Sequence, residues 1–177
     1  MNEEKFFTFL SESFVELRTA LKAGGAIYVC HPDSKGLQFR EAFKTASFAL
    51  KQIIIWSKQH FVMGRQDYQW RHEPILYGWK EGTHHFYGGH NETTVWNVNR
   101  PSASRDHPTM KPVELCARAI RNSSNTGETV LDTFGGSGST LIAAEQLGRK
   151  CYMMEIDPKY CDVIIKRWEN LTGQTAE

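Results

Sequence analysis

A glycine-rich turn stands between an apolar run and a helical pattern in the last third of the chain. The run Val130-Leu131-Asp132 has the character of a buried strand, and residues 135–138, with three glycines, follow it closely. Glycine lets the backbone approach a ligand, and the free amides of a helix start favour a carboxylate or phosphate. Glu155 ends the next apolar strand about 20 residues further on, where an acid binds ribose hydroxyls in such folds. The pattern predicts a nucleoside-binding half-fold.

Three classes of cofactor compete for this turn. An ATP-binding P-loop needs a Gly-Lys-Ser/Thr sequence, and the chain has none. A dinucleotide fingerprint needs a third glycine where Leu141 stands, which weakens a nicotinamide cofactor without excluding it. S-adenosyl-L-methionine is therefore favoured, and a turn that merely packs a helix on a strand is the remaining alternative.

The rest of the chain alternates between helical and strand patterns. Apolar residues at spacings of three and four predict a helix over residues 3–22, with Asn2 as its N-cap and Gly24-Gly25 as its end. Short β-branched or aromatic runs predict strands. Strands are expected at residues 26–30, 50–57, 74–79, 129–132 and 151–155, and helices near 36–46, 112–123, 139–147 and 158–171. This alternation predicts an α/β fold with a mostly parallel sheet.

Two motifs resemble those of a known family. Asp132-x-Phe134-x-Gly136-x-Gly138 is similar to the cofactor motif of the N6-adenine and N4-cytosine DNA methyltransferases, and His107-Pro108-Thr109-Met110-Lys111-Pro112 resembles the segment that precedes it in them. The resemblance spans essentially the whole chain. It implies a permuted, Rossmann-like methyltransferase sheet, mostly parallel with one antiparallel strand, and S-adenosyl-L-methionine as cofactor. The residues it implies at the cofactor are Asp132, Phe134, Gly135, Gly136, Ser137, Gly138 and Glu155, with Thr109, Lys111 and Pro112 at the methionine part.

The resemblance favours a site-specific DNA methyltransferase that moves a methyl group to an exocyclic amino group, with adenine N6 preferred over cytosine N4. It leaves open whether methylation serves restriction or regulation. A nicotinamide-dependent oxidoreductase is disfavoured by Leu141 and by the lack of a hydride-transfer site. The third hypothesis is a non-catalytic protein that binds cofactor or DNA and regulates or completes a partner.

Double-stranded DNA is the partner that the family implies. The segment from Arg65 to Gly78 looks like the family's stretch entering the antiparallel strand, where aromatic side chains could stack on a flipped base. A packed aromatic cluster is an equal alternative. Residues 81–106 lack periodicity, and a short target-recognition segment is implied there, within one DNA methylase domain of residues 1–177. The candidate DNA contacts are Arg65, Tyr68, Trp70, His72, Lys80, Arg100 and Arg105.

The catalytic motif of this family is not found in the chain. A group that accepts hydrogen bonds must hold the target amine in line with the methyl group, and in the family [Asp/Asn/Ser]-Pro-Pro-[Tyr/Phe/Trp] does this. The sequence contains no Pro-Pro, and neither His31-Pro32 nor Asp157-Pro158 replaces it. The motif is expected upstream of Met1, which leaves no catalytic residue in the chain and a sheet incomplete at its N-terminus. A fragment, a subunit completed by a second polypeptide and a degenerate copy all fit, and we expect weak or no methylation by the chain alone.

Composition restricts the remaining functions. The net charge of +1 does not by itself indicate nucleic-acid binding. No signal-peptide pattern and no apolar run of about 20 residues occur, which predicts a cytoplasmic protein without a membrane span. The four cysteines lie in apolar segments without a Cys-x-x-Cys pair, so buried, reduced thiols are expected. His84, His85 and His90 lack the further ligands in a fixed frame that zinc needs, so no metal is expected.

Overall fold

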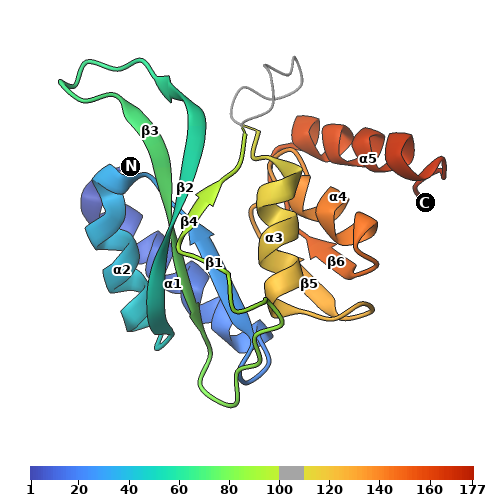
Figure 1. The fold of residues 1–177 in the computed structure, drawn as a ribbon, viewed down its shortest axis with the longest axis horizontal. Helices are drawn as coiled ribbons and strands as arrows, with labels where there is room; N and C mark the ends of the chain where they lie inside the picture. Colours follow the sequence, from blue (N-terminus) through green and yellow to red (C-terminus); the bar gives the residue numbers. More distant parts are fainter. Residues whose placement is uncertain (100–109) are drawn as a thin grey trace. The chain divides into compact units, whose positions relative to one another are not determined.

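The computed structural model describes residues 1–99 and 110–177 of the chain. They form two compact units (Figure 1). Unit 1 comprises Met1–His85 and His90–Asn97, and unit 2 comprises Phe86–Gly89 and the described part of Val98–Glu177. Within the described residues, none of the helices combines the length and the apolar character needed to cross a bilayer.

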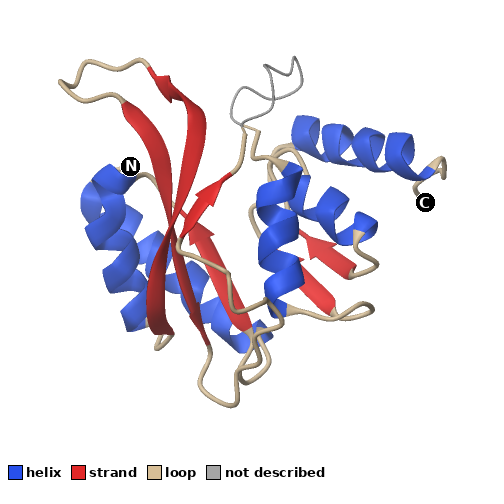
Figure 2. Ribbon diagram, in the orientation of Figure 1, coloured by secondary structure: helices blue, strands red, loops and turns tan. Residues whose placement is uncertain are grey.

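Unit 1 contains two helices that contact each other. Helix α1, Glu3–Ala20, starts where the Asn2 side chain accepts a hydrogen bond from the Lys5 backbone N–H at 2.9 Å. This is the N-cap that the sequence predicts, and it satisfies one of the free amides of the first turn. Helix α2, Gly36–Thr45, follows a 3₁₀ turn, η1, at Asp33–Lys35. In Figure 2 both helices are seen beside the strands of this unit.

The strands of unit 1 form one mixed sheet. They are β1 (Ala26–Cys30), β2 (Ala49–Val62), β3 (Trp70–Trp79) and β4 (Val95–Asn97), in the order β1-β3-β2-β4. Strand β3 pairs antiparallel with both β1 and β2, whereas β2 and β4 pair in parallel. Strand β3 therefore runs against the other strands, which confirms the single antiparallel strand expected. Because it lies between two neighbours, most of the pairing in this sheet is antiparallel.

The core of unit 1 joins the helices to β3. Ala42 and Phe43 of α2 are fully buried, as is Leu76 of β3. Phe14 of α1 meets Phe43 edge to face with ring centroids 5.9 Å apart, an arrangement that aromatic pairs favour. Burying a side chain of this size is worth about 1.5–3 kcal/mol, so the cluster holds both helices on the sheet.

Unit 2 contains a smaller, parallel sheet. Strands β5 (Thr129–Asp132) and β6 (Lys150–Met153) pair in parallel, and helix α4 (Ser139–Gln146) connects them. Helix α3 (Val113–Ser123) precedes β5, and helix α5 (Pro158–Thr172) follows β6 (Figure 1). The order of strands and helices agrees with the sequence prediction.

One face of the β5–β6 sheet is covered by helices and the other is exposed. Val130 of β5 packs against the cluster that contains Ala143 and Ala144, which are fully buried in α4. Side chains alternate along a strand, so Leu131 and its register partner Tyr152 point the other way, and they are 37% and 64% exposed. Parallel sheets usually have both faces covered, and this one does not.

Three sequence expectations need correction. Residues 95–97 form strand β4 inside the stretch expected to be irregular, because Trp96 is buried beside Trp56 of β2, a partner that periodicity does not reveal. Strands β2 and β3 extend beyond the predicted segments, since they form one long hairpin. Cys30, expected to be buried, is exposed at the end of β1, whereas Cys116 is partly buried.

Candidate cofactor site

The glycine loop of unit 2 joins the end of β5 to the start of α4. Its backbone enters the left-handed region at Gly136 and Gly138, with φ of +54° and +79°. The Gly138 N–H donates to the Gly135 carbonyl at 2.8 Å, which closes the turn, and Gly138 is the N-cap of α4. Residues with a side chain rarely adopt these angles, so the loop requires glycine at both positions.

The two sides of this loop differ in the space around them. A Cβ at Gly135 would stand 2.7 Å from the Met153 side chain of β6, and one at Gly138 would stand 3.0 Å from Ile164 Cγ1. At Gly136 the nearest atom would be the Phe134 carbonyl oxygen, 4.0 Å away. The loop therefore packs tightly on β6 and α5 but leaves an open side at Gly136, where a ligand can approach the backbone.

Glu155, predicted to bind ribose, lies directly against this loop. Its Oε2 accepts a hydrogen bond from the Gly136 N–H at 2.6 Å. Its Oε1 accepts from the Ile156 and Asp157 N–H groups, each at 2.9 Å. The carboxylate thus holds the loop to the chain that leaves β6, a contact that the sequence prediction did not include.

Asp132 and Phe134 lie at the entry to the loop. Asp132 Oδ1 accepts a hydrogen bond from the Phe134 N–H at 3.0 Å, so this carboxylate holds the first turn after β5. The Phe134 ring is 59% exposed, which leaves an apolar surface beside the glycines.

The segment that resembles the family's second motif reaches the same place. The backbone carbonyl of Lys111 accepts a hydrogen bond from Ser139 Oγ, at the first residue of α4, at 2.7 Å. Pro112 is buried and directly precedes α3. Thr109 lies outside the described residues, as do Arg100 and Arg105.

Two cysteines near the loop are held in their neutral form. Burial raises the pKa of Cys116 to about 11, and Thr140 Oγ1 contacts its sulfur at 3.7 Å. Burial and the nearby Asp132 charge raise the pKa of Cys151 to about 12. These thiols are therefore poor nucleophiles at neutral pH.

Sequence reasoning missed the contribution of α5 to the loop. Ile164 packs on Gly138, and the Arg167 guanidinium donates to the Ser137 carbonyl. The two positions lie one turn apart on a helix, a spacing that could have indicated a shared face but gave no sign of what that face contacts.

The predicted DNA contacts in unit 1 are divided between two ends of β3. Arg65 and Tyr68 lie in the turn of the β2–β3 hairpin, where Tyr68 is 91% exposed. Trp70 and His72 begin β3 with ring centroids 5.6 Å apart, edge to face. Lys80 follows the other end of β3, and its Nζ donates to the Leu21 carbonyl at 2.8 Å, at the end of α1.

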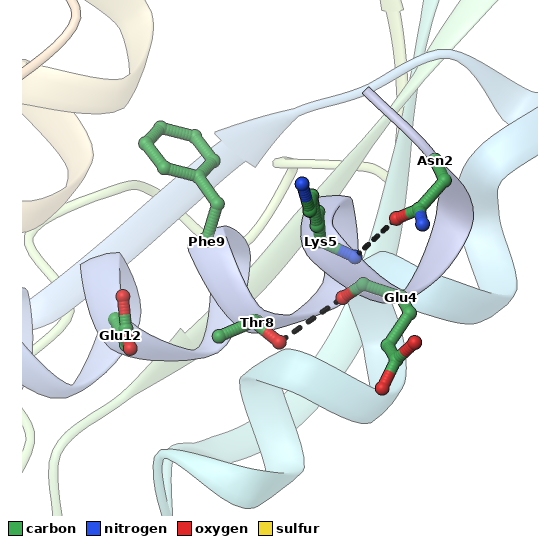
Figure 3. Close-up of a pocket in the computed structure, with 6 residues that line it drawn as sticks. All are labelled: Asn2, Glu4, Lys5, Thr8, Phe9 and Glu12. Atoms are coloured by element: carbon green, nitrogen blue, oxygen red, sulfur yellow. Dashed lines mark hydrogen bonds between the residues drawn. The ribbon is translucent and has the colours of Figure 1, made fainter.

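Two further features of unit 1, the ring of His84 and a hollow on α1, do not have the chemistry of a binding site. His84 stacks on Trp79 at 4.1 Å and lies 2.9 Å from the Gly24 carbonyl and 3.0 Å from the Tyr77 hydroxyl. Among the described residues, no three potential ligands gather into a metal site. A hollow on α1 exposes a mixed set of side chains and contains none of the predicted site residues; it is lined by Asn2, Glu4, Lys5, Thr8, Phe9 and Glu12 (Figure 3).

A strand, a glycine loop, a helix start and an acid just after the next strand are the features of a nucleoside-binding α/β fold. The chain belongs to the DNA methylase family of the N6/N4 type, whose model matches residues 1–167. The family expected from the two motifs is therefore confirmed.

Individual relatives agree with this assignment. The DNA adenine methyltransferase YhdJ of Escherichia coli (strain K12) is 27% identical over 209 residues, which cover 99% of this chain and 71% of YhdJ. The type II methyltransferase M.Cfr9I of Citrobacter freundii is 28% identical over 76% of this chain and 50% of its own length. The chain thus spans about half of the latter relative.

Solved structures share the fold. The M1.HpyAVI–SAM complex aligns with a TM-score of 0.81 at 23% identity. The alignment covers 94% of this chain and 85% of the M1.HpyAVI chain. The PvuII DNA methyltransferase, cytosine-N4-specific, has a TM-score of 0.83 at 15% identity, covering 93% of this chain and 71% of its own. The Rossmann-like methyltransferase sheet expected from the sequence is confirmed by these likenesses.

Proposed function

We propose that the chain binds S-adenosyl-L-methionine, the methyl donor of its family, at the glycine loop of unit 2. The observation that carries this proposal is the loop itself, with glycine angles at Gly136 and Gly138 and an open side at Gly136 beside Glu155. An apolar surface and an acid next to exposed backbone suit a nucleoside. The free amides at the start of α4 suit the carboxylate of the methionine part.

Each predicted residue then has a distinct task. Asp132 and Glu155 hold the loop through hydrogen bonds to backbone amides; Glu155 would bind the ribose, and the exposed ring of Phe134 would contact the adenine. The bound cofactor would supply a methyl group on a positively charged sulfur. The residues assigned to it are Asp132, Phe134, Gly135, Gly136, Ser137, Gly138 and Glu155, with Thr109, Lys111 and Pro112 beside the methionine part.

The reaction of the family is methylation of an amino group in DNA, and double-stranded DNA is its substrate. We assign adenine N6 as the target before cytosine N4. We also propose that the protein acts in the cytoplasm and that residues 1–177 form one partial DNA methylase domain. Contacts to DNA are assigned to the β2–β3 hairpin, with residues 81–106 as the recognition segment. The residues are Arg65, Tyr68, Trp70, His72, Lys80, Arg100 and Arg105, although Lys80 already serves the end of α1.

The 177 residues contain no Pro-Pro motif to handle the target amine, so we assign this motif to a segment outside them, on a second polypeptide or on a longer form of this chain. The exposed face of the β5–β6 sheet supports this assignment, because Leu131 and Tyr152 present apolar surface that a further layer would cover. We expect little or no methylation of duplex DNA by purified chain 1–177 with labelled cofactor. Turnover at ordinary enzymatic rates by residues 1–177 alone would contradict the need for an outside segment.

Calorimetry with S-adenosylhomocysteine and with NAD tests the cofactor. We expect binding of the former only. The Gly138→Ala variant should bind S-adenosylhomocysteine about tenfold more weakly. A side chain in the left-handed region costs roughly 1–2 kcal/mol, and the added Cβ would also press on Ile164. Gly127→Ala is the matched control, because Gly127 has φ of +82° with nothing within 4 Å. Binding of NAD alone, or equal losses in both variants, would overturn the assignment.

A further inference from the structure

Helix α5 reaches the glycine loop through a side chain that the binding proposal does not use. Arg167 Nη1 donates a hydrogen bond to the backbone carbonyl of Ser137, 30 positions away in the sequence. Ser137 is only 5% exposed, so water does not readily replace a lost partner of this carbonyl.

The same helix is fixed to its surroundings on both sides of Arg167. Ile164, one turn earlier, packs where a Cβ at Gly138 would stand 3.0 Å from its Cγ1. Trp168 Nε1 donates to Glu145 Oε2 of α4 at 3.0 Å. The guanidinium therefore extends to the loop from a helix that is itself anchored to the loop and to α4.

The carbonyl that Arg167 contacts shares a peptide unit with the Gly138 N–H. This N–H donates to the Gly135 carbonyl at 2.8 Å, so the two hydrogen bonds act on opposite ends of one peptide. Glycine has little intrinsic preference for one backbone orientation. A charge-assisted hydrogen bond is about twice as strong as a neutral one, and it selects a single orientation of the Ser137–Gly138 peptide.

We propose that Arg167 is a positioning residue for the cofactor. Its guanidinium fixes the Ser137–Gly138 peptide and, through it, the direction of the amides at the start of α4. The inference rests on the proposed role of this loop in binding S-adenosyl-L-methionine. Arg167 acts through the loop and is assigned no contact with the cofactor.

Calorimetry with S-adenosylhomocysteine on three variants tests this role. Arg167→Gln should weaken binding about tenfold or more, the effect of losing one charge-assisted hydrogen bond. Arg167→Lys keeps a charged donor and should recover most of the affinity. Lys166→Gln, at the exposed neighbouring position, should bind like the wild type. Wild-type affinity in Arg167→Gln, or an equal loss in Lys166→Gln, overturns the positioning role.

Amide resonances of the free protein separate this role from the cofactor proposal. The Gly136 and Gly138 amide signals should shift in Arg167→Gln and return toward their wild-type positions in Arg167→Lys. If the wild type binds no S-adenosylhomocysteine, the proposed function fails, and these shifts still decide whether Arg167 orders the loop. An unchanged Gly138 signal in Arg167→Gln overturns the inference.

Discussion

Two acids at the glycine loop of unit 2 hold backbone amides near them in sequence, whereas two polar side chains of unit 1 reach partners far away. At the glycine loop, Asp132 reaches an amide 2 positions on, and Glu155 reaches one 19 positions back. In unit 1, His84 reaches the Gly24 carbonyl across 60 positions, and Arg18 reaches Glu81 across 63. A short motif can therefore specify the first site, whereas the second set of contacts exists only once the sheet has formed.

The two regions also differ in whether backbone groups or side chains would contact a ligand. In the proposed site the loop of unit 2 would bind mainly through main-chain groups, so glycines and one acid are enough to indicate it. The β2–β3 hairpin of unit 1 would act through exposed side chains such as Tyr68, whose identity says little about a partner. A sequence motif is thus a stronger guide to the cofactor site than to the DNA surface.

The largest expected effect concerns a buried ion pair of unit 1. Lys58 Nζ lies 2.6 Å from Glu73 Oε1, with side chains 7% and 26% exposed, and 5.0 Å from the Trp56 ring. Glu73→Ala leaves a buried ammonium without this partner, and removing one member of such a pair costs about 3–5 kcal/mol. Urea unfolding of Glu73→Ala should therefore give a free energy of unfolding about 3–5 kcal/mol below that of the wild type.

The control is an exposed pair of unit 2. The side chains of Arg121 and Glu114 are 45% and 60% exposed, so Glu114→Ala should change stability by no more than about 1 kcal/mol. The double variant Lys58→Met/Glu73→Ala should regain part of the loss, because the unpaired charge is removed. Equal losses in Glu73→Ala and Glu114→Ala would remove the contrast between the units.

A smaller effect concerns pH. His31 is 3% exposed and stacks on Phe39 at 5.0 Å; burial lowers its pKa, and Arg40 adds to this, while the nearby Asp33 and Glu73 act the other way. The unfolded chain takes up this proton first, so stability falls as pH drops from about 6.5 through the lower folded pKa, by at most about 1.4 kcal/mol per pH unit.

Unit 2 should respond at the opposite end of the pH scale. The pKa of Cys116 is raised to about 11, so its contribution is present at neutral pH and is lost as pH rises from about 8.5 toward that value. Unfolding measured from pH 5 to 10 in His31→Gln and Cys116→Ala checks both signs. We expect His31→Gln to reduce the pH dependence of stability only on the acidic side, and Cys116→Ala only on the basic side, where the raised pKa of Cys151 keeps part of the slope. An effect of either variant on the other side contradicts the prediction.

The local signals in the sequence predicted most of the fold. Asn2 caps its helix as expected, and the strand before the glycine loop ends at Asp132. What escaped prediction depends on distant partners. Strand β4 forms because Trp96 pairs with Trp56 of β2. Lys80 donates to the Leu21 carbonyl because the last carbonyls of a helix lack partners within it.

The smallest expected effect on stability belongs to the hairpin tip. Tyr68 is 91% exposed, so Tyr68→Ala should alter the free energy of unfolding by less than about 0.5 kcal/mol. If its ring stacks on a base, the same change should weaken DNA binding by about 1–3 kcal/mol, or roughly 5- to 150-fold. Tyr152→Ala, which removes a 64% exposed ring from unit 2, is the matched control. Fluorescence anisotropy with a labelled duplex measures both variants. Equal affinity of Tyr68→Ala and the wild type would show that exposure of this ring does not mark the DNA surface, and the hairpin would lose its assignment while the cofactor loop kept its own.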